Sequence, residues 1–156
     1  AIFVPEVASK RDGKAKVASR IGFEREAISL SEEDCPYQFL KDQEIPPSCV
    51  FVDEAQFLNR KQIMSLAMIA DRLEVPVYAF GLRTDFKGEP FEGSKYLLSW
   101  ADRIEEVATF ATGGIHATFN MKVDSEGLRV DDGESISVGF GYEPVSRLTF
   151  FAGGER

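Results

Sequence analysis

The hydrophobic and polar residues of the first 110 positions form short apolar runs around two longer helical patterns. The runs predict β-strands at residues 2–4, 17–22, 26–30, 50–52, 75–82 and 105–110, with Pro5 stopping the first. Between the fourth and fifth runs, apolar residues recur at helical spacing at Ile63, Leu66, Ala67, Ala70 and Leu73. A strand, a helix and a strand in this order predict a parallel crossover, which is typical of an α/β fold.

A second helix is predicted at residues 94–103, where Ser94 can serve as the N-cap. Its inward-facing positions would be Leu97, Leu98, Ala101 and Ile104. From residue 111 the pattern changes to short alternating stretches at 117–123, 128–130, 135–140 and 146–151, separated by the turn sequences DSEG and DDGE. We therefore expect an α/β core over residues 1–110 and a small antiparallel β-rich region over 111–156.

The composition narrows the range of partners and compartments. With 18 Lys and Arg against 26 Asp and Glu, the chain has a formal net charge of −8, whereas nucleic-acid binding needs concentrated positive charge. Only Cys35 and Cys49 are present, which argues against a disulfide framework. The sequence has no apolar run near the length of about 18 residues that a membrane span needs, and no signal-peptide pattern. We expect a cytoplasmic protein with small-molecule or protein partners, no nucleic acid and no membrane.

The predicted strand at residues 50–52 ends in two adjacent carboxylates, Asp53 and Glu54, within the stretch VFVDEAQF. In parallel α/β sheets, ligands bind outside the carboxyl ends of the strands. An acid at this place can hold magnesium in phosphate-transferring enzymes, and a neighbouring acid can position or deprotonate the nucleophile. The alternative is a solvated acidic turn, because such a pair often follows an apolar run.

The next predicted strand runs into a long segment, GLRTDFKGEPFEGSKYLL at residues 81–98. This segment contains two Phe residues among glycines and a proline. Packing beneath the loop is the alternative to a binding role for these rings. The chain from Ile2 to its end resembles the thymidine kinases of the bacterial, animal and poxvirus type. The resemblance rests on FVDEAQFL, on GLRTDFKGEPFEGS, on the helix between them and on ATFNMKVDSEG. It implies a P-loop nucleotide-kinase fold with a parallel sheet, flanking helices and a C-terminal antiparallel region of the zinc-ribbon type.

The resemblance also implies a role for each matching residue. Asp53 matches the magnesium-associated acid, and Glu54 matches the general base that takes the proton of the thymidine 5′-hydroxyl as this oxygen attacks the γ-phosphate of ATP. The implied nucleoside contacts are Phe57, Phe86, Phe91, Val138, Gly139 and Tyr142, the last three in a loop that folds over thymine and binds it largely through main-chain groups. Arg20 is a weaker match to a phosphate contact, and an ordinary surface arginine fits it equally well.

The chain departs from this family at the structural zinc site. Family members usually bind zinc through two cysteines near the start of the β region and through Cys or His near its end. The aligned positions here are Ala111, Gly113, Ser146 and Thr149, so the ligand set is missing. His116 is the only histidine and fits a surface residue better, since one side chain cannot replace four ligands. We predict that the chain binds no zinc and that its β region depends on packing.

A second departure concerns the phosphate cradle, a Gly-x4-Gly-Lys-Ser/Thr loop between a strand and a helix. The sequence contains no such motif. The nearest approaches are residues 88–95, where Ser and Lys stand in the wrong order, and Gly13-Lys14, which lacks the earlier glycine. In the family, the cradle precedes the strand that residues 2–4 resemble. We therefore expect that the chain is N-terminally incomplete and that residues 1–156 alone do not transfer phosphate.

Three functions remain open on this evidence. The resemblance favours a thymidine kinase that uses ATP with Mg²⁺ in nucleotide salvage, forms a homo-oligomer, commonly a tetramer, and has dTTP as a candidate feedback inhibitor. The absent cradle and zinc ligands leave open a non-catalytic relative that still binds a nucleoside. A different ATP hydrolase would also suit VFVDE, but the aromatic block at residues 81–94 argues against it.

Overall fold

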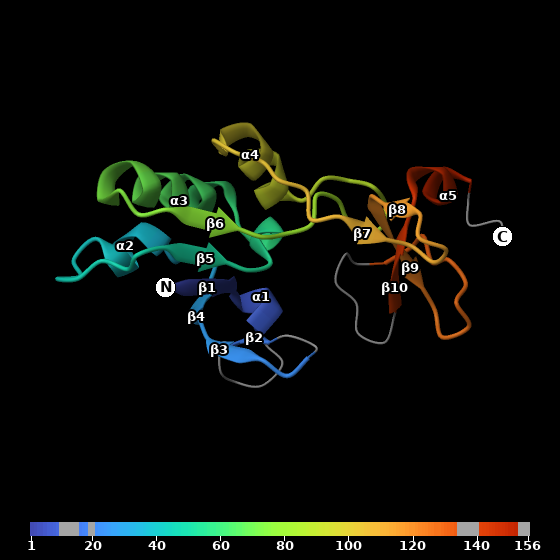
Figure 1. Ribbon diagram of the computed structural model, residues 1–156, viewed down its shortest axis with the longest axis horizontal. Helices are drawn as coiled ribbons and strands as arrows, with labels where there is room; N and C mark the ends of the chain where they lie inside the picture. The colour runs from blue at the N-terminus through green and yellow to red at the C-terminus, as the bar shows by residue number, and fades with distance from the viewer. Residues whose placement is uncertain (10–15, 19–20, 134–140, 153–156) are drawn as a thin grey trace. The chain divides into compact units, whose positions relative to one another are not determined.

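The computed structural model describes residues 1–9, 16–18, 21–133 and 141–152, which belong to two compact units (Figure 1). Unit 1 consists of Ala1–Arg83 and Phe91–Asp102, and unit 2 consists of Thr84–Pro90 and Arg103–Arg156. Unit 2 therefore begins before the expected boundary at residue 110 and also takes in a turn of the aromatic block. Two contacts account for this difference: Phe110 pairs with His116 in a hairpin, and the Phe86 ring centroid lies 4.8 Å from Nζ of Lys122.

Unit 1 is built around a four-stranded parallel sheet with the strand order β4-β1-β5-β6. These strands span Ile28–Leu30, Ile2–Pro5, Val50–Val52 and Val77–Ala79, respectively. β1 pairs in parallel with β4 and β5, and β5 pairs in parallel with β6. The predicted α/β class is confirmed. The strands are shorter than most of the apolar runs, and β1 includes Pro5, which pairs with Leu30 as its last residue.

The first predicted helix is α3 (Arg60–Leu73), which connects β5 to β6 and so confirms the parallel crossover. Asn59 caps it: the Asn59 side chain accepts a hydrogen bond from the Gln62 N–H (3.0 Å), and the Gln62 side chain accepts one from the Asn59 N–H (3.1 Å). The buried face of the helix joins the strands in a core formed by Phe3, Leu30, Leu40, Val50, Val52, Ala55, Leu58, Ile63, Leu66, Ile69 and Val75.

The second helix, α4 (Glu92–Trp100), differs from the prediction at both ends. Its N-cap is Phe91 and not Ser94. The buried Ser94 hydroxyl donates to the Leu82 carbonyl (2.6 Å), so it ties the helix to the segment after β6. The predicted inward face was also mostly wrong, because the helix ends at Trp100 and only one of the four positions packs on the core. Leu97 packs there, whereas Leu98, Ala101 and Ile104 are exposed.

Four further short elements of unit 1 precede β5 among the described residues. They are α1 (Glu6–Ser9), β2 (Lys16–Ala18), β3 (Glu24–Glu26) and α2 (Pro36–Leu40). β2 and β3 pair as antiparallel strands, so of the predicted strand at 17–22 the described part is a strand only at its first two residues. β3 and α2 are too short to show an apolar period, and the sequence pattern did not predict them.

Unit 2 contains two antiparallel strand pairs and a short helix. β7 (Thr109–Phe110) pairs with β8 (His116–Ala117), and β9 (Phe119–Val123) pairs with β10 (Gly141–Val145). The predicted antiparallel region is confirmed. The predicted strand at 105–110 shrinks to its last two residues, and the one at 128–130 is reduced to an isolated bridge between Val123 and Arg129. The predicted strand at 135–140 lies outside the described residues.

The last stretch of unit 2 is a helix where a strand was predicted. α5 (Arg147–Phe151) begins at the N-cap Ser146, whose hydroxyl accepts a hydrogen bond from the Thr149 N–H (3.1 Å). The prediction was wrong because this cap satisfies a backbone donor at the helix start, which outweighs the β-propensity of Thr and Phe.

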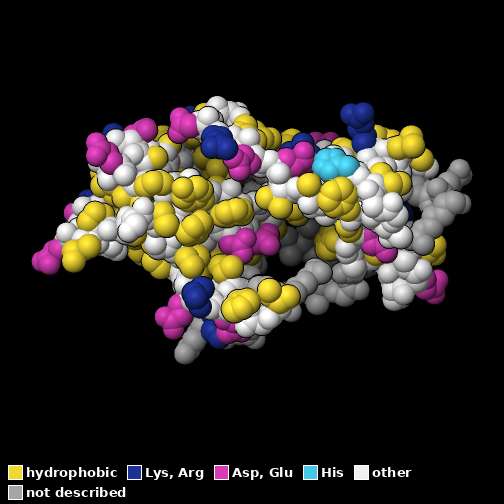
Figure 2. Space-filling model, viewed as in Figure 1, with side chains coloured by type: hydrophobic (Ala, Val, Ile, Leu, Met, Phe, Trp, Pro, Cys, Tyr) yellow, Lys and Arg dark blue, Asp and Glu magenta, His cyan; other side chains and the backbone are white. Residues whose placement is uncertain are grey.

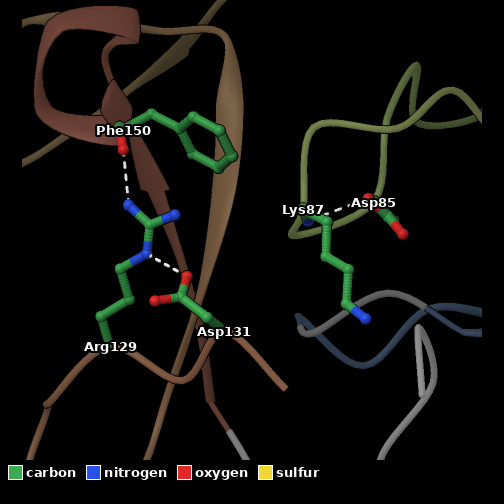
Figure 3. A network of polar contacts seen from close by, with 5 residues as sticks. All are labelled: Asp85, Lys87, Arg129, Asp131 and Phe150. Carbon is green, nitrogen blue, oxygen red and sulfur yellow. Dashed lines mark hydrogen bonds and ion pairs between the residues drawn. The ribbon is translucent and has the colours of Figure 1, made fainter. Parts of the chain in front are cut away.

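A cluster around Phe150 holds α5 in place; we call it the Phe150 cluster, formed by Phe119, Arg129, Phe150 and Phe151. Phe150 is buried and stacks on Phe119 with ring centroids 4.4 Å apart, and Phe151 meets both rings at an angle. The Arg129 guanidinium lies 4.9 Å from the centroid of the Phe150 ring. Arg129 also donates to the Phe150 carbonyl and pairs with Asp131 (Figure 3). Side-chain contacts therefore hold α5 against β9 and the segment that follows β9.

Several large apolar side chains of unit 1 are exposed on its surface. Phe51 of β5 stacks on Tyr78 of β6 with centroids 5.3 Å apart and lies 6.2 Å from Phe80. All three are at least 40% exposed, and Figure 2 shows hydrophobic side chains spread over this part of unit 1. In the parts of the chain that the structure describes, no helix combines the length and the apolar content needed to cross a membrane.

Candidate active site

Asp53 and Glu54 follow β5 at the carboxyl end of the central strands of unit 1 (Figure 1). The chain then forms one 3₁₀ turn, η1 (Ala55–Phe57). β5 lies between two parallel neighbours, β1 and β6, so its carboxyl end is the kind of edge at which α/β sheets bind ligands. The structure places both predicted acids at this edge.

The backbone of Glu54 lies in the left-handed region, with φ 52° and ψ 36°. This conformation costs a non-glycine residue about 1–2 kcal/mol, so the surrounding structure must hold it. Three hydrogen bonds do so: the Glu54 N–H donates to Asp53 Oδ1 (3.0 Å), the Ala55 N–H donates to the Phe80 carbonyl (2.8 Å), and the Phe57 N–H donates to the Glu54 carbonyl (3.1 Å). The direction of the Glu54 side chain is thus set by the sheet and the turn together.

Gln56 is part of this turn, and its side chain contacts the Glu54 carboxylate. Its side chain is 1% exposed; Nε2 donates to Glu54 Oε2 (2.6 Å), and Oε1 accepts from the Leu82 N–H (3.2 Å). Gln56 is part of the VFVDEAQF stretch, but an uncharged amide gives no sequence signal of its own, so no role was predicted for it. The structure adds it to the site as the polar side chain in direct contact with the proposed base.

Two glycines allow the backbone to approach the turn closely. A Cβ at Gly81 would lie 2.5 Å from Oε1 of Gln56, and one at Gly93 would lie 2.5 Å from the Ala55 carbonyl oxygen. Both separations are too short for a real side chain. The segment after β6 and the first turn of α4 therefore pack directly against η1 and leave it little room to move.

Two of the predicted aromatic residues meet beside the turn. Phe57 and Phe91 form an edge-to-face pair with centroids 5.4 Å apart and an interplanar angle of 79°. They help to enclose a cavity of about 310 Å³, which is lined by Glu32, Gln56, Phe57, Leu58, Asn59, Phe91 and Glu92. Asp53 and Glu54 are not among the residues lining this cavity. Its lining combines two aromatic rings and Leu58 with four polar or charged side chains, Glu32, Gln56, Asn59 and Glu92.

Phe86, the third predicted aromatic, lies in unit 2 and is buried. Oδ1 of Asp85 accepts hydrogen bonds from the N–H groups of Lys87 (2.8 Å) and Glu89 (3.0 Å), which closes the turn around Phe86 (Figure 3). Phe86 is 2% exposed, and Nζ of Lys122 lies 4.8 Å from the centroid of its ring. This is the packing that the sequence left open as the alternative, and a nucleoside contact by Phe86 stays a prediction.

The remaining predicted contacts fall at the end of unit 2 or outside the described residues. Tyr142 is 42% exposed on β10, opposite Lys122 of β9. Val138, Gly139 and Arg20 lie outside the described residues, as does the Gly13-Lys14 pair.

The positions aligned with the family's zinc ligands come together in unit 2. Ala111, Ser146 and Thr149 line one cavity, and the two hydroxyls of Ser146 and Thr149 are 3.0 Å apart. Gly113 lies in the turn between β7 and β8 with φ 84°. Within the described ranges, the structure has no group of three or more His, Cys, Asp and Glu side chains that could hold a metal ion. The absence of zinc stays a prediction, based on these side chains.

His116 is exposed, as predicted for a surface histidine. Its Nε2 lies 3.5 Å from a carboxylate oxygen of Glu106, and its ring meets the edge of Phe110. The contact with Phe110 lies within the β7–β8 hairpin, in which these two residues pair.

Comparison with known proteins gives one consistent result. The family model described as "Thymidine kinase" matches residues 1–150 of this chain. A thymidine kinase of Coxiella burnetii is 45% identical over 141 residues, covering 88% of this chain and 71% of that protein. A thymidine kinase of Rhodopirellula baltica is 43% identical over 153 residues, covering 96% of this chain and 72% of that protein. A thymidine kinase of Shewanella oneidensis is 44% identical over 144 residues, covering 90% of this chain and 75% of that protein.

Proposed function

The chain belongs to the thymidine kinase family, and on this basis we propose that it transfers the γ-phosphate of ATP to the 5′-hydroxyl of thymidine. The product is thymidine monophosphate, a DNA precursor made by nucleotide salvage. One observation in the structure carries the proposal: the Glu54 carboxylate is fixed at the carboxyl end of β5 by a left-handed backbone and a hydrogen bond from Gln56.

Glu54 acts as the general base in this proposal. A hydroxyl is a weak nucleophile until its proton has an acceptor, and a carboxylate within hydrogen-bond reach supplies one. Phosphoryl transfer otherwise depends on positioning and on charge stabilisation. A base with a fixed side-chain direction supports the positioning of the attacking oxygen, which is why the strained backbone of Glu54 is relevant to the chemistry.

Asp53 is the residue that would hold Mg²⁺. Its carboxylate is half-buried beside Glu54, and oxygen ligands of this kind suit Mg²⁺, which proteins usually bind through one or two carboxylates together with substrate phosphates and water. When bound, the ion would neutralise charge on the transferred phosphoryl group. A single carboxylate can fill that role, because substrate phosphates and water supply the remaining ligands.

For the nucleoside we propose aromatic and main-chain contacts. The Phe57–Phe91 pair and its cavity offer apolar walls that suit a flat base. From the resemblance we also propose Phe86 and Tyr142, main-chain groups around Val138 and Gly139, and a weaker phosphate contact by Arg20. We further propose that the reaction depends on Mg²⁺, that the protein is cytoplasmic and forms a homotetramer, that dTTP is a feedback inhibitor, and that the protein contains no structural zinc.

The test is the substitution Glu54→Gln in the full-length gene product, assayed with radiolabelled thymidine, ATP and Mg²⁺. We expect turnover to fall by about 10² to 10⁴-fold, because the amide keeps the shape of the side chain and loses the proton acceptor. Thymidine binding, measured by calorimetry, should change little.

Glu74→Gln is the matched control, since Glu74 is also a left-handed glutamate (φ 56°) but is exposed at the end of α3. It should leave turnover unchanged. An equal loss of turnover and binding in Glu54→Gln would assign Glu54 to binding only. Absence of product from the wild-type protein, with thymidine binding retained, would favour the non-catalytic relative.

A further inference from the structure

We propose that Gln56 is a positioning residue for the reaction: its side-chain amide fixes the Glu54 carboxylate against the end of the sheet. The inference rests on the proposed function, in which Glu54 accepts the proton of the substrate hydroxyl. It assigns a role to a buried, uncharged side chain in direct contact with the base.

The orientation of the Gln56 amide follows from its two partners. The Leu82 main-chain N–H lies 3.2 Å from one end of the amide, and because an N–H can only donate, this end must be the oxygen Oε1. The nitrogen Nε2 then faces Glu54 Oε2 at 2.6 Å and donates to it. An ionised carboxylate is an acceptor only, so both contacts agree with the same orientation.

The amide cannot turn or withdraw easily. The Gln56 side chain is 1% exposed, and Gly81 packs so closely that a Cβ there would lie 2.5 Å from Oε1. One end of the amide is bonded to the main chain after β6, and the Ala55 N–H is bonded to the Phe80 carbonyl in the same segment. Gln56 therefore fixes the Glu54 carboxylate relative to the backbone that follows the neighbouring strand β6.

This contact also divides the work between the two carboxylate oxygens of Glu54. Oε2 accepts from Gln56, which leaves Oε1 to face the substrate proton. A side chain with three rotatable bonds would otherwise sample several directions, and a displacement of about 1 Å in a reacting group can cost about 10²-fold in rate. A donor that fixes one oxygen and leaves the other for the hydroxyl supports turnover more than substrate affinity.

The experiment compares Gln56→Glu with wild type in the full-length protein. The new carboxylate has nearly the same shape and still accepts from the Leu82 N–H, but in its ionised form it cannot donate to Glu54. We expect kcat to fall by about 10 to 100-fold with KM for thymidine changed less than about threefold. Gln62→Glu is the matched control, because Gln62 is also buried and its Nε2 donates to the Ser31 carbonyl (2.8 Å), which an ionised glutamate cannot do; it should lower the melting temperature and keep kcat.

A double-mutant cycle separates positioning from a general structural role. In a Glu54→Gln background, Gln56→Glu should cause little further loss of kcat, because the base that it positions is already gone. The same fold-loss in both backgrounds would overturn the proposal, and so would wild-type kcat in Gln56→Glu.

Gln56→Asn covers the case in which Gln56→Glu does not fold. The shorter side chain keeps both polar ends but cannot reach Leu82 and Glu54 together, so kcat should again fall with KM retained. Wild-type kcat in this variant would overturn the proposal. Full turnover by Glu54→Gln alone would instead overturn the assignment of the base, and the positioning role with it, which distinguishes that failure from a failure of Gln56 only.

Discussion

The turn after β5 in unit 1 and the helix α5 in unit 2 are stabilised by different kinds of contact. In unit 1, the turn after β5 is fixed by main-chain hydrogen bonds and by glycines that let backbone pack against backbone. In unit 2, the end of the chain is fixed by side chains, mainly the Phe150 cluster. The comparison indicates that a group that must point in one direction is built on backbone geometry, whereas a small β region can be stabilised by contacts between side chains.

The difference bears on the missing zinc ligands. A structural zinc would connect the start of the β region to its end, and the aligned positions Ala111, Ser146 and Thr149 do lie around one cavity. In this chain, the stacked rings of Phe119 and Phe150 and the contacts of Arg129 connect α5 to β9 and to the segment that follows β9. We regard the Phe150 cluster as the packing on which the predicted zinc-free region depends.

The largest expected effect tests whether unit 2 depends on that cluster. Phe150→Ala should destabilise unit 2 by about 3–5 kcal/mol, because it removes a buried ring together with its contacts to Phe119 and Arg129. Amide hydrogen exchange should show lost protection in β9 and β10 and unchanged protection in α3. Phe151→Ala is the control: the same residue type, one position on and 73% exposed, should cost less than about 1 kcal/mol. Equal effects of the two substitutions would mean that the stacked pair is not the stabilising contact.

A smaller effect tests the backbone packing in unit 1. Alanine is normally favoured over glycine within a helix by about 1 kcal/mol, but Gly93→Ala in α4 should destabilise by about 1–3 kcal/mol, because its Cβ meets three carbonyl oxygens of the turn at 2.5–2.8 Å. Turnover should fall with stability, since the same turn carries Glu54.

Gly141→Ala in β10 is the matched change in unit 2, measured by thermal unfolding. Its Cβ would meet a side-chain atom, Cγ2 of Val123, at 3.2 Å, and a side chain can move aside. We expect a change within about 0.5 kcal/mol. A Gly93→Ala protein as stable and as active as wild type would show that the close backbone approach is not required.

The same contrast explains what could be predicted from sequence. The parallel strands and α3 were predictable because their apolar periods are local, and Asp53 and Glu54 were predictable because they end an apolar strand. Gln56 and Gly81 were not, because their importance comes from contacts with residues about 25 positions apart in the chain. The prediction of a strand at α5 was wrong, because its conformation depends on one side chain, the Ser146 cap.

The aromatic block shows the limit in another way. The sequence places Phe86 and Phe91 five positions apart, but the fold divides them between two compact units. Phe91 pairs with Phe57 beside η1, whereas Phe86 turns into the interior of unit 2. The Asp85 carboxylate accepts hydrogen bonds from the N–H groups of Lys87 and Glu89 and so closes the turn that carries Phe86, and these contacts are visible only in the folded structure.

The last prediction concerns metal binding by unit 2, and for the wild-type protein it expects no effect of metal removal. Zinc sites use thiolates, imidazoles or carboxylates, usually four in a structural site, whereas among the described residues that line the cavity around Ala111, Ser146 and Thr149 only Glu143 supplies such a group. Purified protein should therefore carry less than about 0.1 zinc per chain by elemental analysis, and a chelator should leave its thermal unfolding unchanged. Introducing cysteine at residues 111, 113, 146 and 149 supplies the positive control: zinc uptake by that variant would show that the positions can converge on one ion, although cysteine at residue 113 must adopt the left-handed conformation of Gly113 (φ 84°). One zinc per wild-type chain would contradict the alignment and would mean that a metal ion stabilises unit 2.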